Sequence, residues 1–289
     1  MIASLGPDIP LELLQATKRL AGPLGWNIDR DFPQAGQWLE SKFPRWAFSI
    51  VEDWAAGAFD QLETVVFSRG DDSAQRLYYY VCELRARGLL AGPEPVIFDV
   101  ARIGRTLSEA RCIASVRQLA ERLDVSDAAL EAAIAATTPG ATAANEGRIC
   151  LLGGTPPPDE RLHRAIAAAG WQARGKTLAE SWLGDGLAAQ GGTGDPCAAL
   201  GKRLHASRGG VRSFADRGAV LVAQLRECGG HAAVLWFAEE DEAEVWNLPA
   251  QRRALEAEGV PVLVLTRRDW RANDGAPEEI AAFLAGEGA

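Results

Sequence analysis

The cysteines are the side chains of this sequence best suited to hold a metal or a redox cluster, because thiolates are soft ligands. Their spacing opposes both uses. They are odd in number, widely separated and never arranged as a C-x-x-C pair: Cys82, Cys112, Cys150, Cys197 and Cys228. This spacing argues against a disulfide framework and against a zinc ribbon. Since free cysteine is commonly buried as a small apolar residue, we expect structural roles for most of them.

Two glycine-containing stretches could bind an anion or a nucleotide. Gly153-Gly154-Thr155 precedes an expected helix whose N–H groups could bind an anion, but no Gly-Lys-Thr closes this turn. The run from Gly170 to Thr177 does match the spelling of a P-loop. That motif acts only between a strand and a helix, and an expected helix, Glu160–Ala169, precedes it here. We therefore interpret the match as a chance one.

The remaining polar candidates are isolated. Asp71 and Asp72 follow an expected strand, where they are either site carboxylates or the N-cap of the next helix. His163, His205 and His231 have no histidine four residues away and no Ser or Cys elbow beside them. The sequence therefore predicts neither a metal site nor a catalytic triad.

The elements that must position these residues alternate along the chain. Apolar runs predict strands, and apolar residues three to four positions apart predict helices. The expected strands are Thr64–Ser68, Pro95–Val100, Arg148–Leu152, His231–Phe237 and Val260–Thr266. The expected helices are Pro10–Ala21, Ala74–Gly88, Leu107–Leu123, Asp127–Ala136 and Glu160–Ala169. Apolar strands separated by helices favour mostly parallel sheets covered on both faces.

The alternation restarts near the middle of the chain, which predicts two doubly wound α/β domains, residues 1–140 and 146–289. A stretch rich in Ala, Thr, Gly and Pro at 137–147 is the expected linker. Ligands are expected beyond the carboxyl ends of the strands. The Gly-rich, poorly patterned stretch Gly184–Val211 is expected to be a mobile surface loop.

Composition limits the partners. The net charge of −9 argues against nucleic acid and anionic membranes, because both require an excess of Lys and Arg. Met1–Pro10 has neither the basic nor the apolar region of a signal peptide, and no apolar run reaches the roughly 18–20 residues that span a bilayer. We expect a cytoplasmic protein.

Order and spacing along most of the chain match a known family. In the first half the matching features are Val65–Ser68, Asp71, a Tyr-rich helix, Pro95–Val100 and Leu123–Ser126. In the second half they are Arg148–Gly154, Ala168–Trp171, Trp246–Pro249 and Gly259–Leu265. These features resemble the cluster subunits of 2-hydroxyacyl-CoA dehydratases and benzoyl-CoA reductases, over about residues 10–285.

The resemblance implies two flavodoxin-like domains, a homologous partner subunit and an acyl-CoA thioester as ligand. It also implies a [4Fe–4S] cluster held by three cysteines, with an ATP-dependent activator supplying one electron. This sequence departs from the family at all three cysteine positions, which fall near Phe43, Gly70 and Asp241. Gly and Phe offer no donor atom, and one carboxylate cannot replace three thiolates. We therefore expect no cofactor on this chain and the [4Fe–4S] cluster on a partner subunit.

The resemblance also suggests a ligand pocket. Its candidate residues are Ser68, Asp71, Arg102, Arg105, Gly153, Gly154, Thr155, Trp246 and Asn247. Arg102 and Arg105 either bind a CoA phosphate or are ordinary surface residues. Two hypotheses follow: a cluster-free subunit of a heteromeric dehydratase or reductase that shapes the acyl-CoA pocket or docking surface, or a stand-alone protein that binds acyl-CoA or a nucleotide-like ligand. An enzyme with other chemistry ranks last.

Overall fold

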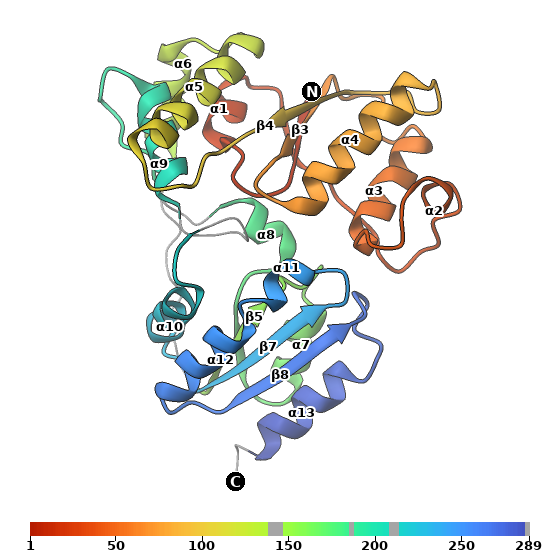
Figure 1. Ribbon diagram of the computed structural model, residues 1–289, viewed down its shortest axis with the longest axis vertical. Coiled ribbons are helices and arrows are strands. Elements are labelled where there is room, and N and C mark those ends of the chain that lie inside the picture. The colour runs from red at the N-terminus through yellow and green to blue at the C-terminus, as the bar shows by residue number, and fades with distance from the viewer. Residues whose placement is uncertain (138–146, 185–187, 208–213, 287–289) are drawn as a thin grey trace. The chain divides into compact units, whose positions relative to one another are not determined.

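The computed structural model describes residues 1–137, 147–184, 188–207 and 214–286 (Figure 1). The expected linker at 137–147 lies almost entirely outside these residues. No helix within the described ranges is both long enough and apolar enough to cross a membrane.

The chain forms two compact units. The first comprises Met1–Ala141 and Trp182–Phe214, and the second comprises Thr142–Ser181 and Ala215–Ala289. Each contains one four-stranded, all-parallel sheet flanked by helices, which confirms the predicted α/β class with flavodoxin-like domains.

The sheet of the first unit has the order β2-β1-β3-β4. Its strands are β1 (Ile2–Leu5), β2 (Leu20–Pro23), β3 (Thr64–Ser68) and β4 (Glu94–Phe98). Its helices are α1 (Leu11–Ala16), α2 (Ala35–Trp38), α3 (Arg45–Ala55), α4 (Asp72–Ala86), α5 (Thr106–Arg122), α6 (Asp127–Ala136) and α9 (Pro196–Ala206). All residues of β1 and β3 are buried, as central parallel strands require.

The second unit repeats this topology with the order β6-β5-β7-β8. Its strands are β5 (Ile149–Gly154), β6 (Gln172–Arg174), β7 (Ala232–Ala238) and β8 (Val262–Arg268). Its helices are α7 (Arg161–Ala168), α10 (Arg217–Cys228), α11 (Glu242–Val245), α12 (Leu248–Ala257) and α13 (Ala276–Gly286), while α8 (Leu178–Trp182) contains the point in the sequence where the second unit gives way to the first. α10 packs with α12, and α7 packs with α13.

The predicted helix over Pro10–Ala21 is wrong in its second half. α1 ends at Ala16, Lys18 adopts a left-handed conformation with φ 57°, and Leu20 begins β2. A left-handed residue cannot continue a right-handed helix, so the chain reverses there and returns to the sheet.

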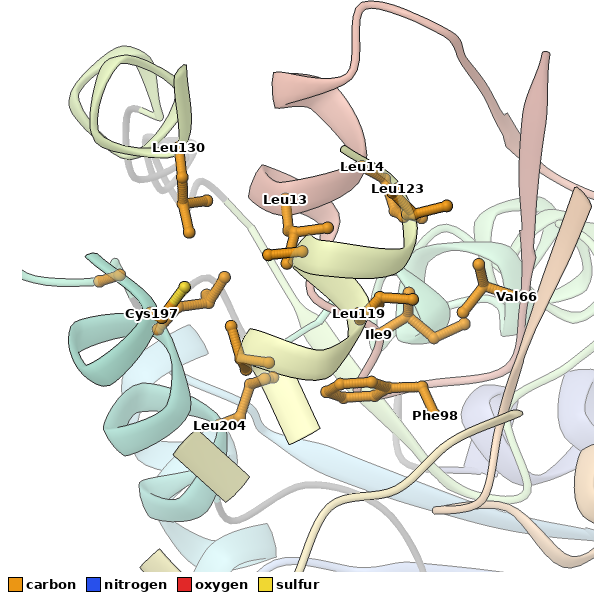
Figure 2. Packing of buried hydrophobic residues seen from close by; sticks show 14 of the residues in the cluster. Ile9, Leu13, Leu14, Val66, Phe98, Leu119, Leu123, Leu130, Cys197 and Leu204 are labelled. Atoms are coloured by element: carbon orange, nitrogen blue, oxygen red, sulfur yellow. The ribbon is translucent and has the colours of Figure 1, made fainter. Parts of the chain in front are cut away.

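One core cluster lies on one face of the first sheet (Figure 2). It joins side chains of β1, β3 and β4 to α1, α5, α6 and α9. Figure 2 shows Cys197 and Leu204 of α9 directed toward side chains of α1 and α5. The second unit has a separate core of Leu221, Leu225 and Leu255 against Leu235 and Phe237 of β7.

Much of the predicted mobile loop Gly184–Val211 is instead ordered. α9 occupies its middle and buries six of its eleven residues in the first unit. Asp195 caps the helix by accepting a hydrogen bond from the Ala198 N–H, and Pro196 occupies its first turn. The prediction was wrong because small residues line the buried face, so the apolar period is weak. Residues 185–187 and 208–211 of that stretch lie outside the described ranges.

Candidate functional site

Each sheet has one point where the strand order reverses, and doubly wound proteins bind ligands there, beyond the carboxyl ends of the strands. In the first unit this point lies between β1 and β3, and in the second it lies between β5 and β7. The chain that follows β1, β3, β5 and β7 therefore defines the two candidate sites.

A buried ion pair closes the first of these points. Asp8, three residues beyond β1, pairs with Arg102 from the loop after β4. The side chains are 10% and 4% exposed. Arg102 Nη1 also donates to the carbonyl oxygens of Leu204 at 3.1 Å and Ser207 at 2.5 Å, at the end of α9. The guanidinium that the sequence offered for a CoA phosphate is thus bound by groups of its own chain.

The sequence analysis assigned no role to Asp8, although Gly6-Pro7-Asp8 directly after an apolar tetrapeptide is a signal for a strand end. Asp8 adopts φ 63°, a left-handed conformation that Asp and Asn tolerate better than most residues. Gly6 has φ 98°, and a Cβ there would lie 2.7 Å from Ser68 Cβ. Glycine is therefore required where the chain leaving β1 crosses the end of β3.

Three further predicted residues follow β3 and β4, the strands whose ends lie near this ion pair. Ser68 is buried, and its Oγ accepts a hydrogen bond from the Gly70 N–H at 2.9 Å. Asp71 is the N-cap of α4 and accepts from the Ala74 N–H at 2.7 Å, which confirms the expected cap. Arg105 lies at the exposed N-terminus of α5. These contacts assign Ser68 and Asp71 to the local fold.

Side chains of α5 and α9 hold the loop after β4 through contacts with the backbone of Ala101. Cys112 Sγ lies 3.2 Å from both the backbone N and the carbonyl oxygen of Ala101. His205 Nδ1 lies 2.8 Å from the same carbonyl oxygen, the distance of a hydrogen bond in which Nδ1–H donates. Arg102 therefore projects from a short loop that α5 and α9 both hold.

At the reversal point of the second unit, a threonine hydroxyl joins the ends of the two strands. Thr155, the first residue after β5, donates from Oγ1 to Asp241 Oδ2 at 2.7 Å. The same Oγ1 accepts from the Ala238 N–H at 3.3 Å, and Thr155 N–H donates to the Trp236 carbonyl at 2.8 Å. Asp241 is also the N-cap of α11. One hydroxyl thus links the ends of β5 and β7.

The loop after β5 is poorly suited to hold a phosphate. Pro156, Pro157 and Pro158 follow Thr155, and proline has no N–H to donate. Gly153 and Gly154 are the last residues of β5 and pair with β7. A Cβ on Gly154 would overlap the Trp236 carbonyl oxygen, so this glycine allows close strand packing.

The remaining predicted pocket residues lie between α11 and α12. Trp246 is 85% exposed, the highest exposure among the large apolar side chains of the described chain. Asn247 Nδ2 donates to Glu244 Oε2 at 3.3 Å. Glu244 is itself buried and paired with Arg217 at 2.9 Å, yet burial raises the pKa of its carboxyl above the ordinary value.

Burial also raises the pKa of Glu240, which accepts a hydrogen bond from Trp270 Nε1.

The P-loop spelling does not form a phosphate loop. Residues 172–174 inside it are β6, paired in register with β5. A strand therefore lies within the motif, which the sequence analysis did not predict. Its residues pair with β5, so they are not free to form the loop that would surround a phosphate. Thr177 Oγ1 donates to Glu180 Oε2 at 2.9 Å, and its backbone N–H donates to the same oxygen at 2.8 Å, as in a capping box.

At the three positions where the family resemblance implies cysteines, the residues present do not fit an iron–sulfur cluster. Phe43 is a core residue, packed edge-on against Tyr80 and covered by the guanidinium of Arg76. A Cβ on Gly70 would lie 2.8 Å from Asp8 Oδ2, so a cysteine there requires a shift of the ion pair. Asp241 is occupied as a helix cap. None of the three supplies a thiolate.

The five cysteines present are free thiols, and four have raised thiol pKa values because of burial: Cys112, Cys197, Cys228 and, at about 12, Cys150. A raised pKa opposes the thiolate form that metals bind. Within the residues that the structure describes, no three His, Cys, Asp or Glu side chains are grouped so that they could hold a metal ion.

Comparison with known proteins adds no assignment. No protein-family model matches the chain, and no curated protein sequence matches it significantly.

Proposed function

We propose that this chain is the cluster-free subunit of a heteromeric, cytoplasmic complex similar to 2-hydroxyacyl-CoA dehydratases and benzoyl-CoA reductases. It pairs with a homologous subunit that carries the [4Fe–4S] cluster, and it shapes the acyl-CoA pocket or the surface on which an ATP-dependent activator docks. The chemistry takes place on the partner.

One observation carries the proposal. Both units keep the doubly wound, flavodoxin-like topology that the family resemblance implies, while all three cysteine positions have been absorbed into the fold. Phe43 belongs to the core, Gly70 faces Asp8, and Asp241 caps α11. A scaffold retained without its ligands fits a role in assembly better than a role in electron transfer.

Anaerobic co-expression with a cluster-bearing homologue tests the proposal. With the affinity tag on this chain alone, we expect one heteromeric complex with about four irons, all retained by the partner after dissociation. This chain purified by itself should hold almost no iron or acid-labile sulfide. The Cys150→Ser variant is the matched control and should leave the iron content unchanged.

Two results count against the proposal. If the chain elutes alone after co-expression with cluster-bearing homologues, it does not form the proposed complex. About four irons on the isolated chain would mean that its own cysteines were recruited. Thermal-shift measurements with acyl-CoAs, and with ATP and Mg²⁺, are informative in either case, because a ligand that binds the isolated chain raises its melting temperature by mass action.

A further inference from the structure

The first unit consists of a main body, Met1–Ala141, and a later segment of the chain that is separated from it in sequence by residues of the second unit. Trp182–Phe214 belongs to this unit, but Ser181 before it and Ala215 after it belong to the other. Within the first unit, the segment is therefore held to Met1–Ala141 by non-covalent contacts. We call it the return segment. Its docking is physically equivalent to the binding of a tethered ligand.

The start of the return segment is anchored by aromatic packing. Trp182 lies edge-on to Trp26, with ring centroids 4.9 Å apart, and edge-on to Trp46, with centroids 5.2 Å apart. Trp182 and Trp46 are both almost fully buried. Such edge-to-face pairs stabilise a fold beyond the apolar area that they bury.

The middle of the segment buries an apolar helix face. Cys197, Leu200 and Leu204 of α9 join the core cluster shared with α1, α5 and α6 (Figure 2). At Gly201 the helix approaches α5 so closely that a Cβ would lie 2.7 Å from Ile113 Cα. The surface that receives α9 is therefore shaped for this sequence.

Polar contacts fix the orientation of α9. Arg203 pairs with Glu12 of α1 at 2.7 Å, and their side chains are 14% and 6% exposed. At the carboxyl end, Leu204 and Ser207 offer their carbonyl oxygens to Arg102. At the amino end, Asp195 pairs with Arg117 of α5. Both ends of the helix are thus matched to specific residues of the main body.

We propose that the return segment is exchangeable, so that two copies of this chain form a dimer in which each first unit is closed by the other chain's α9. In the exchanged dimer the same residues make every contact described above, but the two partners of each contact come from different chains. The two arrangements differ in the entropy of bringing the segment to its site, because closure within one chain is intramolecular and exchange joins two molecules. A high protein concentration lowers this extra cost of exchange. In such a dimer the partner copy supplies the carbonyl groups that bind Arg102. This proposal is independent of the cluster-bearing partner.

A charge reversal across the buried pair separates exchange from closure within one chain. Glu12→Arg and Arg203→Glu each place like charges together when a chain closes on itself. When the two variants are mixed, the exchanged heterodimer joins the two substituted side chains in one pair of reversed polarity and keeps Glu12 with Arg203 in the other. Neither pair then contains like charges.

The two variants are co-refolded with different tags and analysed by size exclusion with light scattering. We expect a species of twice the 30.9 kDa chain mass that carries both tags, at least about tenfold enriched over either variant alone.

Two controls define the result. The double variant Glu12→Arg/Arg203→Glu restores the pair within one chain and should behave as wild type. The same reversal at the Arg226–Glu258 pair of the second unit, made as Arg226→Glu mixed with Glu258→Arg, should give no more doubly tagged dimer than wild-type chains do, because this pair does not belong to the exchanged contacts. No doubly tagged species from the Glu12 and Arg203 variants, while the double variant folds, overturns the proposal.

A second measurement tests exchange in the wild-type chain, without any substitution. Wild-type chains with two tags are co-refolded at high concentration, and the reactivity of Cys197 is measured by thiol labelling. A doubly tagged dimer with Cys197 still protected supports exchange, because the docked helix buries this thiol. A dimer with reactive Cys197, or no dimer at any concentration, contradicts it.

Discussion

The two reversal points have the same topology but are closed by different chemistry. In the first unit, the Asp8 carboxylate and the Arg102 guanidinium form a buried ion pair that also binds the end of α9. In the second unit, the Thr155 hydroxyl links Asp241 to the Ala238 N–H. Removing one partner of a buried ion pair strands a charge, whereas removing a hydroxyl strands only hydrogen-bonding groups. The first unit is therefore the more sensitive to substitution at this point.

The units also differ in how they are completed. The second is made of two stretches, both carrying strands of its sheet, while the first recruits the return segment, whose described residues contribute no strand. Its closure depends on side chains that meet across large separations in sequence, such as Glu12 and Arg203. The first unit should therefore lose more stability than the second when contacts of this kind are removed.

Arg102→Met should have the largest effect. It removes the guanidinium from the buried Asp8 and from two carbonyl groups of α9, at an expected cost of about 3–5 kcal/mol in the stability of the first unit. Urea unfolding followed by tryptophan fluorescence measures this loss. Adding Asp8→Asn should recover part of it, since Asn is neutral and tolerates the left-handed backbone of Asp8. Arg117→Met, in an exposed pair, should cost less than about 1 kcal/mol. Equal losses of stability in the Arg102→Met and Arg117→Met variants would show that the buried pair stabilises the fold no more than the exposed pair does.

Gly201→Ala should destabilise the first unit by about 1–3 kcal/mol, because its Cβ meets the backbone of α5. The matched control is Gly36→Ala in α2, where a Cβ meets open space and alanine favours the helix by up to about 1 kcal/mol. Chemical denaturation of both variants provides the comparison. A Gly201→Ala variant as stable as the Gly36→Ala variant would rule out the close packing of α9 on α5.

Thr155→Val should weaken the second unit by about 1–2 kcal/mol, because the side chain keeps its shape but leaves Asp241 without the hydroxyl donor and the Ala238 N–H without its acceptor. Thr266→Val, at an exposed position in β8, is the control and should change stability little. Hydrogen exchange at the Ala238 amide offers an independent measurement, and protection equal to wild type would contradict the assigned contact.

Glu240→Gln should have the smallest effect and should depend on pH. Burial raises the pKa of Glu240 in the folded protein, so its contribution to stability is complete below about pH 4.3 and is lost as pH rises through the folded-state pKa. Gln stays neutral, and it can still accept the Trp270 hydrogen bond. We expect the variant to match wild type near pH ~4 and to exceed it by less than about 1 kcal/mol near pH ~7. The same difference at both pH values, or the same behaviour from the exposed control Glu239→Gln, would contradict the role of burial.

The regular part of the fold was predictable from sequence. Strands with long apolar runs, such as Val65–Phe67 and Ala232–Phe237, and the caps at Asp71 and Ser126 carry strong local signals. β1, β2 and β6 were missed because they are only three or four residues long, too short for a period to emerge. Missing β1 meant missing Asp8, and with it the partner of Arg102.

The candidate sites were predictable only in part. Ser68, Thr155 and Asp241 do lie at the reversal points, because the carboxyl ends of apolar strands can be read from the sequence. Their partners could not be predicted, because Asp8 and Arg102, or Thr155 and Asp241, are brought together by chain order within the sheet. No local pattern indicates that α9 packs in the first unit, since its contacts join residues as distant as Glu12 and Arg203.

The return segment has a consequence for synthesis on the ribosome. The main body of the first unit ends at Ala141, yet the segment that covers its α1–α5–α6 surface ends at Phe214. At about 5–20 residues per second, the intervening chain takes several seconds to translate. Throughout that interval, nascent Leu13, Leu119 and Leu130 lack their α9 neighbours, and β5 of the second unit emerges before the first can close. During this interval the uncovered apolar surface of α1, α5 and α6 is open to aggregation and available to a chaperone.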